Sequence, residues 1–175
     1  MPEKTFSPSH SPSLSFVLST EEQTADLATK LASSITNLAT TQPNLRLHIS
    51  LVGDLGAGKT TFTRYLLKAL GHTGKVKSPT YALCEPYDLL INGHQLAVHH
   101  FDLYRMKYAE EWVDAGFRDT FSNPGICLVE WAEKAEGTLP KVDCTITLEM
   151  NEDESRQMAI TSHSDLGEAL LRPIH

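Results

Sequence analysis

The chain has 175 residues, a length that suits one domain able to bury a hydrophobic core without disulfides or a structural metal. Hydrophobic residues make up 41% and charged residues 21% of it, and no apolar run is long enough to cross a bilayer, which excludes a wholly disordered chain and a membrane-embedded one. The net charge of −7 argues against a protein that grips nucleic acid by itself, because such binding needs Lys and Arg to neutralise phosphates, although it leaves room for a local basic patch.

The N-terminal segment carries Ser-Pro steps and no apolar periodicity. We therefore predict a flexible tail over residues 1–15, followed by a single domain over residues 16–175. The start lacks the basic stretch and apolar run of a secretory signal, so we expect a cytoplasmic protein. Cys84, Cys127 and Cys144 agree with reduced thiols in that compartment, since their number is odd and their spacing fits no zinc or redox motif.

The domain begins with an amphipathic helix. Residues 19–22 have the spacing of a capping box, and apolar residues recur at helical intervals over residues 27–38. This helix should end before Pro43, where the chain loses a backbone donor. Residues 45–51 then alternate between apolar and polar, which predicts a strand, and residues 61–70 place their apolar side chains on one helical face. The sequence therefore predicts a strand, a glycine-rich loop and a helix in succession.

The glycine-rich loop carries the strongest functional signal. Residues 53–60 read Gly-Asp-Leu-Gly-Ala-Gly-Lys-Thr and match G-x-x-x-x-G-K-[ST] between a strand and a helix, as the mechanism requires. Glycines let backbone N–H groups turn toward phosphate oxygens, and the helix N-terminus adds partial positive charge. Lys59 can reach the β- and γ-phosphates, and the Thr60 hydroxyl can enter the coordination shell of Mg²⁺. The predicted phosphate-binding residues are Gly56, Ala57, Gly58, Lys59, Thr60 and Thr61.

Ser78-Pro79-Thr80-Tyr81 lies between this helix and the next predicted strand, where a switch segment could bring the Thr80 hydroxyl to the γ-phosphate. Taken alone, such a turn is more often an ordinary loop. The eight histidines show no metal-ligand spacing and are interpreted as surface or packing residues, with His99 and His100 on opposite faces of a strand.

Two carboxylates follow predicted buried strands. Asp102 comes after the strand that contains residues 96–98, and Glu130 ends the strand of residues 126–129. A P-loop nucleotidase needs a carboxylate at such a place to hold Mg²⁺ or its waters, and the sequence leaves open which of the two does so and which positions water. The predicted catalytic residues are Lys59, Asp102 and Glu130, and the predicted metal-binding residues are Thr60, Glu130 and Asp102.

The remaining elements complete the predicted fold. Residues 106–121 look mainly helical, residues 144–150 and 156–161 form a hairpin, and residues 164–171 form a short closing helix capped by its first serine. We therefore expect an α/β protein with a P-loop NTPase-type sheet, flanking helices and a C-terminal β-hairpin.

Four motifs together resemble those of the bacterial TsaE (YjeE) family: GDLGAGKTT at 53–61, SPTY at 78–81, HFDLYR at 100–105 and VEW at 129–131. Their order and spacing match over nearly the whole chain after the predicted tail. The resemblance implies the ATPase of the machinery that forms threonylcarbamoyladenosine on tRNAs reading codons that begin with adenine. Ala132 departs from the family pattern, in which a proline usually follows the Glu-Trp pair.

The resemblance also implies roles for individual residues. Thr60 and Glu130 would contact Mg²⁺, and Asp102 would be required for hydrolysis. The implied nucleotide-site residues beyond the loop are Thr80, Trp131, Thr24 and Arg156, the last two near the adenine of ATP or ADP. The implied partners are the TsaD and TsaB proteins, which would hold the tRNA and accelerate an otherwise slow turnover. The acidic charge of the chain fits this division of labour.

Two other functions share the same loop. A small-molecule kinase must shield the γ-phosphate from water, typically under a basic lid, and we find no arginine-rich lid segment in the sequence. A nucleotide-dependent switch would recruit partners in its ATP state with incidental hydrolysis, and the sequence separates it poorly from an ATPase. A GTPase is disfavoured because the sequence has no N-K-x-D guanine motif.

Overall fold

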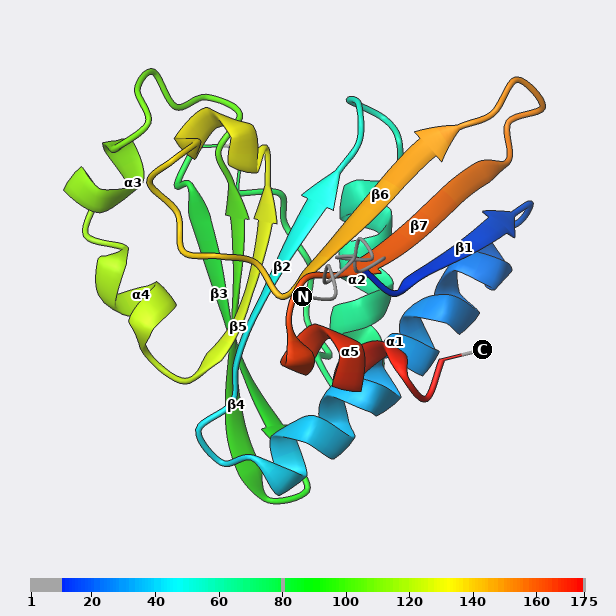
Figure 1. Ribbon diagram of the computed structural model, residues 1–175, viewed down its shortest axis with the longest axis horizontal. Coiled ribbons are helices and arrows are strands. Elements are labelled where there is room, and N and C mark those ends of the chain that lie inside the picture. The colour runs from blue at the N-terminus through cyan, green and yellow to red at the C-terminus, as the bar shows by residue number, and fades with distance from the viewer. Residues whose placement is uncertain (1–10, 80, 175) are drawn as a thin grey trace, which may run out of the picture.

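The computed structural model describes residues 11–79 and 81–174, which form one seven-stranded sheet with helices on both faces (Figure 1). The strand order is β1-β7-β6-β2-β5-β4-β3. Strands β2, β4, β5 and β6 run parallel to their neighbours within the centre of the sheet, and β1, β3 and β7 pair antiparallel. The strands are β1 Ser13–Leu18, β2 Arg46–Val52, β3 Cys84–Ile91, β4 His94–Asp102, β5 Gly125–Glu130, β6 Cys144–Met150 and β7 Arg156–Ser162.

The helices form two unequal layers. The longer helices lie on one face of the sheet and the two short helices α3 and α4 on the other, as Figure 1 shows. Thr20 caps the first helix by accepting a hydrogen bond from the Gln23 amide at 3.2 Å, and Ser164 caps the last by accepting one from the Gly167 amide at 3.0 Å. The helices are α1 Glu21–Thr41, α2 Lys59–Ala69, α3 Glu111–Asp114, α4 Arg118–Ser122 and α5 Asp165–Leu171, with a 3-10 turn at Ala132–Ala135.

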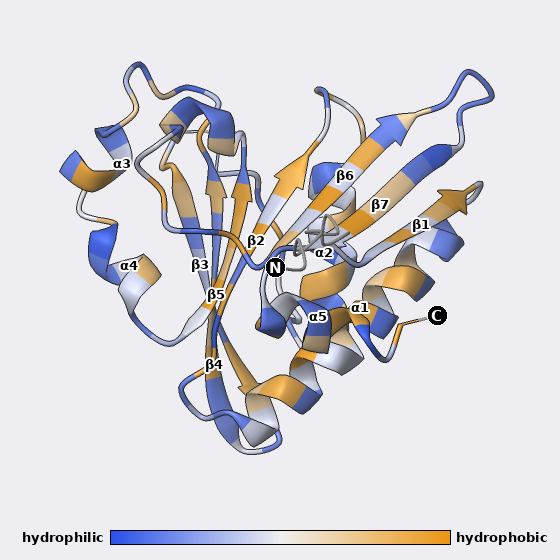
Figure 2. Cartoon of the chain, in the orientation of Figure 1, coloured by the Kyte–Doolittle hydropathy of each residue, from blue (hydrophilic) through white to orange (hydrophobic). Residues whose placement is uncertain are grey.

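Each face of the sheet has its own hydrophobic core, and β5 contributes to both. Ile126 and Leu128 pack into the core beneath α1, α2 and α5, whereas Cys127 and Val129 pack beneath α3 and α4. Figure 2 shows the result as hydrophobic residues along the central strands, in contrast to the hydrophilic loop between β6 and β7. β5 lies in the interior of the sheet between β2 and β4, every one of its residues is buried, and its last residue, Glu130, ends at the same edge as β2.

The predicted α/β sheet with flanking helices and a C-terminal hairpin is confirmed. The alternation in β2 has a structural reason, because His48 faces the thinner layer and meets the edge of the Phe121 ring at 5.4 Å between centroids. Within the described residues, no helix is both long enough and apolar enough to cross a membrane.

Three sequence-based expectations need correction. Part of the predicted tail, Ser13 to Ser15, belongs to β1, which pairs with β7 along its full length; the part of the tail in residues 1–10 lies outside the described residues. Strand β3 was not expected. The helical stretch predicted over 106–121 consists of α3 and α4, because Gly116 between them has a positive φ of 90° that interrupts the helix.

Candidate functional site

The loop between β2 and α2 has the backbone conformation of a phosphate cradle. Gly56 and Gly58 take positive φ values of 82° and 108°, a region that glycine adopts without the steric cost of a side chain. Gly53 is needed for a different reason, because a Cβ atom there would lie 2.5 Å from the Leu148 carbonyl oxygen of β6. The glycines therefore let the loop curl over the N-terminus of α2 and rest against the neighbouring strand.

Lys59, the first residue of α2, is buried and turned back over the loop. Its ammonium group donates a hydrogen bond to the Gly53 carbonyl and lies 4.1 Å from the centroid of the Trp131 ring. Trp131 follows β5 and has a left-handed backbone with a φ of 59°, unusual for a bulky residue. This turn places the indole beside Lys59. The nucleotide contact that the resemblance implies for Trp131 stays a prediction.

Asp102 and Glu130 end the adjacent parallel strands β4 and β5 and are register partners. Parallel strands end at the same edge of a sheet, so the two carboxylates lie together beside the loop that follows β2. Burial raises the pKa of Asp102, the amide of Tyr104 opposes this by donating to its Oδ1 at 3.0 Å, and the charge of Glu130 raises the pKa further. The structure therefore brings together Lys59, Asp102 and Glu130, as the sequence predicted.

His100 is a site residue that the sequence analysis missed. Its side chain is fully buried, and its Nε2 lies 3.3 Å from Oε2 of Glu130, which is itself only 2% exposed. The contact is within ion-pair distance, yet its geometry does not make a hydrogen bond, so neither ring nitrogen has a hydrogen-bond partner among the described residues. His99 and His100 do occupy opposite faces of β4, as expected. His100, which was interpreted as a surface or packing residue, contacts the carboxylate of Glu130.

The donor set suits Mg²⁺. Glu130 Oε1 is buried and accepts no hydrogen bond from the described residues, and such an orphaned carboxylate oxygen is costly unless a cation or its water fills the place. Among the described residues, no three or more His, Cys, Asp or Glu side chains form a metal-binding group. Mg²⁺ needs none, because it commonly uses one or two carboxylates, a hydroxyl and the phosphates of its nucleotide.

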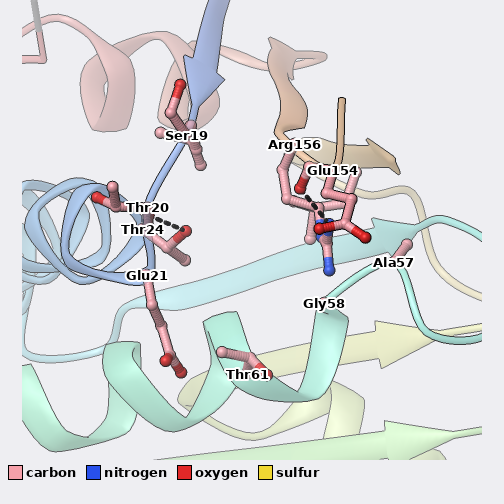
Figure 3. A pocket seen from close by; sticks show the side chains of 11 residues that line it. Ser19, Thr20, Glu21, Thr24, Ala57, Gly58, Thr61, Glu154 and Arg156 are labelled. Carbon is pink, nitrogen blue, oxygen red and sulfur yellow. Dashed lines mark hydrogen bonds between the residues drawn. The ribbon is translucent and has the colours of Figure 1, made fainter. Parts of the chain in front are cut away.

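A second group of predicted residues lines a pocket of about 250 Å³ on the α1 side of the loop (Figure 3). Thr24 contributes from the first turn of α1, Gly58 and Thr61 from the loop and α2, and Arg156 from the start of β7. Arg156 is held by a hydrogen bond from its Nη1 to the Glu154 carbonyl at 2.9 Å, and its Nε approaches Gly58. Figure 3 shows the guanidinium group reaching down between the hairpin and the loop.

The predicted site residues thus divide between the two sides of the loop. Gly58, Thr61, Thr24 and Arg156 line the 250 Å³ pocket, Gly56 and Trp131 line a second hollow of 580 Å³ together with β6, and Ala57 lines both. This arrangement was not predicted from the sequence, because it depends on the pairing of β6 with β2. The predicted switch residue Thr80 lies outside the described residues.

Known proteins resemble this chain in both sequence and fold. The sequence profile of the family described as "Threonylcarbamoyl adenosine biosynthesis protein TsaE" matches residues 18–158. A tRNA threonylcarbamoyladenosine biosynthesis protein TsaE from Haemophilus influenzae is 43% identical over 133 residues, which cover 73% of this chain and 81% of that protein. Its namesake from Bacillus subtilis is 40% identical over 114 residues, covering 65% and 68% respectively. The crystal structure of Bacillus subtilis YdiB matches with a TM-score of 0.71 at 29% identity and covers 93% of both chains.

Proposed function

Because the chain belongs to the TsaE family, we propose that it binds ATP with Mg²⁺ and hydrolyses it to ADP and phosphate during formation of the threonylcarbamoyl group on adenosine of tRNA. The tRNAs are those reading codons that begin with adenine. The protein acts with TsaD and TsaB in the cytoplasm and reaches the tRNA mainly within that complex. The relatives' names support the modification pathway, and the site supports the chemistry.

The observation that carries the proposal is the cradle at the N-terminus of α2. Two glycines with positive φ and the first turn of an 11-residue helix offer backbone N–H groups, and a buried lysine begins that helix. A triphosphate is the ligand that such a set of donors binds best. To bind it, Lys59 exchanges the Gly53 carbonyl for phosphate oxygens, so its hydrogen bond is not lost on binding.

The two carboxylates would organise the metal and the attacking water. Thr60, Glu130 and Asp102 are the residues that would hold Mg²⁺, which when bound supplies positive charge to the phosphate oxygens. Asp102 keeps its Oδ1 fixed by the Tyr104 amide, so its other oxygen is available to orient a water molecule. The buried His100 ring lies 3.3 Å from Glu130 Oε2, and this contact limits the positions that the carboxylate can take.

The adenosine part would occupy the pocket lined by Thr24, Thr61 and Arg156. This pocket adjoins the loop through Ala57 and Gly58, so a nucleotide whose phosphates lie in the cradle can extend into it. The hydroxyls and the guanidinium group supply polar contacts there, and Leu18 and Leu148 supply apolar ones.

The test combines calorimetry of ATP binding with phosphate release, measured with and without TsaD and TsaB. Lys59→Ala should weaken binding at least about tenfold, since it removes a charged hydrogen-bond donor to phosphate. Glu130→Gln should retain binding but lose at least about a hundredfold in turnover, within the range for electrostatic and proton-transfer groups. Absence of magnesium-dependent ATP binding by the folded wild type would refute the proposal.

The same pair of variants separates an ATPase from a nucleotide-dependent switch. If Glu130→Gln still supported full tRNA modification with TsaD and TsaB, hydrolysis would be incidental and ATP binding alone would be the function. If it supported none while binding ATP normally, turnover itself would be required.

A further inference from the structure

We propose that this protein contacts RNA directly, through a basic hollow at the C-terminal end of α2 that binds the sugar-phosphate backbone. The hollow has a volume of about 1060 Å³, and we call it the α2 basic groove. Its charged or titratable lining residues are Arg64 and Lys68 of α2 and His72 and Lys75 of the segment that follows. That the RNA is a tRNA rests on the proposed function; that the groove binds a polyphosphate rests on its own chemistry.

The charge of this region is opposite to that of the chain. Residues 55–84 contain five Lys or Arg residues and not one Asp or Glu, although the whole chain has 15 basic and 22 acidic residues. Three of the five, Arg64, Lys68 and Lys75, line the groove, and its lining includes no acidic side chain. The groove therefore concentrates positive charge on a chain that is acidic as a whole, and such a local patch attracts a polyanion.

The basic side chains of the groove are exposed to solvent and form no salt bridge within the described part of the chain. Arg64 and Lys68 are exposed and stand four residues apart, so they lie on the same face of α2. Lys75 is also exposed. Within the part of the chain that the structure describes, none of these three side chains lies within salt-bridge distance of a carboxylate. The three cations are therefore available to an external anion.

The floor of the groove is held in a fixed shape. The His72 ring meets the Tyr87 ring edge to face at 4.8 Å between centroids, and its Nε2 lies 3.3 Å from the Lys75 carbonyl oxygen. The Lys77 amide donates to the Tyr87 hydroxyl at 3.3 Å. Both ends of the 72–77 segment are thus anchored on β3, which positions Lys75 opposite α2 and reduces the ordering cost of binding.

The lining favours RNA over a protein partner. Protein interfaces are enriched in aromatic residues and Met and depleted in Lys, whereas sites for nucleic acid backbones combine Lys, Arg, small polar residues and backbone N–H groups. The groove has two lysines and an arginine, two glycines and a threonine, and its one aliphatic lining residue is the half-buried Val76. This composition matches a phosphate-binding surface.

The groove is separate from the nucleotide site. None of the groove's lining residues belongs to the glycine-rich loop or lines the 250 Å³ pocket. Along α2, Lys59 is five residues from Arg64 and nine from Lys68, which sets them roughly 8 Å and 14 Å apart at 1.5 Å per residue. RNA in the groove would therefore not occupy the phosphate cradle, and its binding should not require ATP.

The experiment measures binding of fluorescently labelled tRNA to the protein alone, by anisotropy at low and moderate salt and without nucleotide. Lys68→Gln/Lys75→Gln removes two charges from the groove, and Lys107→Gln/Lys141→Gln removes two exposed charges elsewhere as a charge-matched control. We expect the groove variant to bind at least about tenfold more weakly and to lower the slope of log affinity against log salt by about 1.4 to 1.8, at roughly 0.7 to 0.9 per phosphate contact. The control should change affinity less than about twofold.

Three outcomes would overturn the proposal: no tRNA binding by the wild type at low salt, equal losses in both variants, or unchanged tRNA binding with loss of binding to TsaD and TsaB. The last would make the groove a protein-docking surface. Thermal unfolding of each variant shows whether it is folded, and phosphate release by the groove variant shows whether the nucleotide site is intact. The tRNA-binding measurement contains no nucleotide. Its result therefore remains interpretable even if the protein proves not to hydrolyse ATP.

Discussion

Lys59 has two partners in the structure that a triphosphate would replace, the Gly53 carbonyl and the face of the Trp131 ring. A cation 4.1 Å from an indole centroid perturbs the electronic states of the ring, so Trp131 is a built-in reporter of the lysine's position. The left-handed backbone of Trp131 keeps the ring there, and no such arrangement can be read from the order of residues.

We therefore predict that ATP with Mg²⁺ changes the intrinsic fluorescence of the protein by drawing the ammonium group away from the indole. Lys59→Met without nucleotide should reproduce part of that change, because it too removes the cation from the ring. Emission spectra of the wild type, Lys59→Met and Trp131→Phe measure this. A Lys59→Met spectrum identical to that of the free wild type would count against the contact.

Asp102 predicts a pH dependence of stability. Burial raises its pKa above the ordinary value of 3.8, so the unfolded chain releases this proton at lower pH than the folded one. Both states hold the proton at low pH. As the pH rises between the two pKa values, ionisation favours the unfolded state and the contribution of Asp102 to stability falls.

Asp102→Asn removes this effect while keeping an oxygen for the Tyr104 amide. The unfolding free energy of the variant relative to the wild type should increase with pH from about 4 and then level off above the raised pKa. Urea unfolding of both proteins without nucleotide at several pH values provides the measurement. A difference that is independent of pH would show that the pKa of Asp102 is ordinary.

At the scale of elements, the site depends on how β6 supports the glycine-rich loop. A Cβ atom on Gly53 would lie 2.5 Å from the Leu148 carbonyl and 3.2 Å from the Ala57 Cβ, and neither can move without moving backbone. Gly53 does not have a positive φ, so the backbone itself would accept alanine. The contacts with β6 and Ala57, and not the backbone conformation, demand a glycine here.

Gly53→Ala should therefore destabilise the fold by about 1–3 kcal/mol, as overpacking does, and weaken ATP binding by pushing the loop off β6. Asp54→Ala, at an exposed neighbouring position of the same loop, is the matched control and should change stability by less than about 0.5 kcal/mol. Urea unfolding and calorimetry of ATP binding test both. Equal effects of the two substitutions would exclude the contact as their cause.

The elements predicted from the sequence are those whose own residues show a clear pattern of apolar residues or a helix cap. The run of β5 is apolar because both its faces are buried, and α1 has a cap and a 3.6-residue period. The two strands that were missed, β1 and β3, form the two edges of the sheet. An edge strand has one neighbour and tolerates Ser-rich or Pro-containing sequence, as at Pro86, so its pattern is weak.

The same distinction applies to the site. The positions of the loop and of the carboxylates Asp102 and Glu130 in the fold were predictable, because the loop follows a recognisable strand and each carboxylate ends one; their roles stay predictions. His100 was not, because its role comes from a neighbour 30 positions away that only strand pairing brings near. The α2 basic groove was likewise hidden, since the net charge describes the chain as acidic while the helix and its following segment gather cations locally.

For the whole molecule, burial controls the chemistry of the thiols. Cys84, Cys127 and Cys144 are all buried, and burial raises the pKa of each to about 12. We predict that the native protein reacts negligibly with a thiol reagent near pH 8, because only the thiolate reacts, and that unfolding in urea releases three reactive thiols. Thr73→Cys, at an exposed position, is the positive control and should add one thiol that reacts in the native state. Rapid native labelling of the wild type would contradict the burial.

The pocket of Figure 3 is assembled from opposite ends of the chain: Thr24 in α1, Gly58 in the loop and Arg156 at the start of β7. During synthesis on the ribosome, the chain emerges from its N-terminus, so the cradle is made long before the last wall of the pocket. A nascent chain that stops short of β7 carries every residue of the phosphate loop but lacks the guanidinium group and the strand beside it. If the pocket holds adenosine as proposed, full affinity for ATP requires β7 and would be reached only after that strand has been synthesised and has joined the sheet.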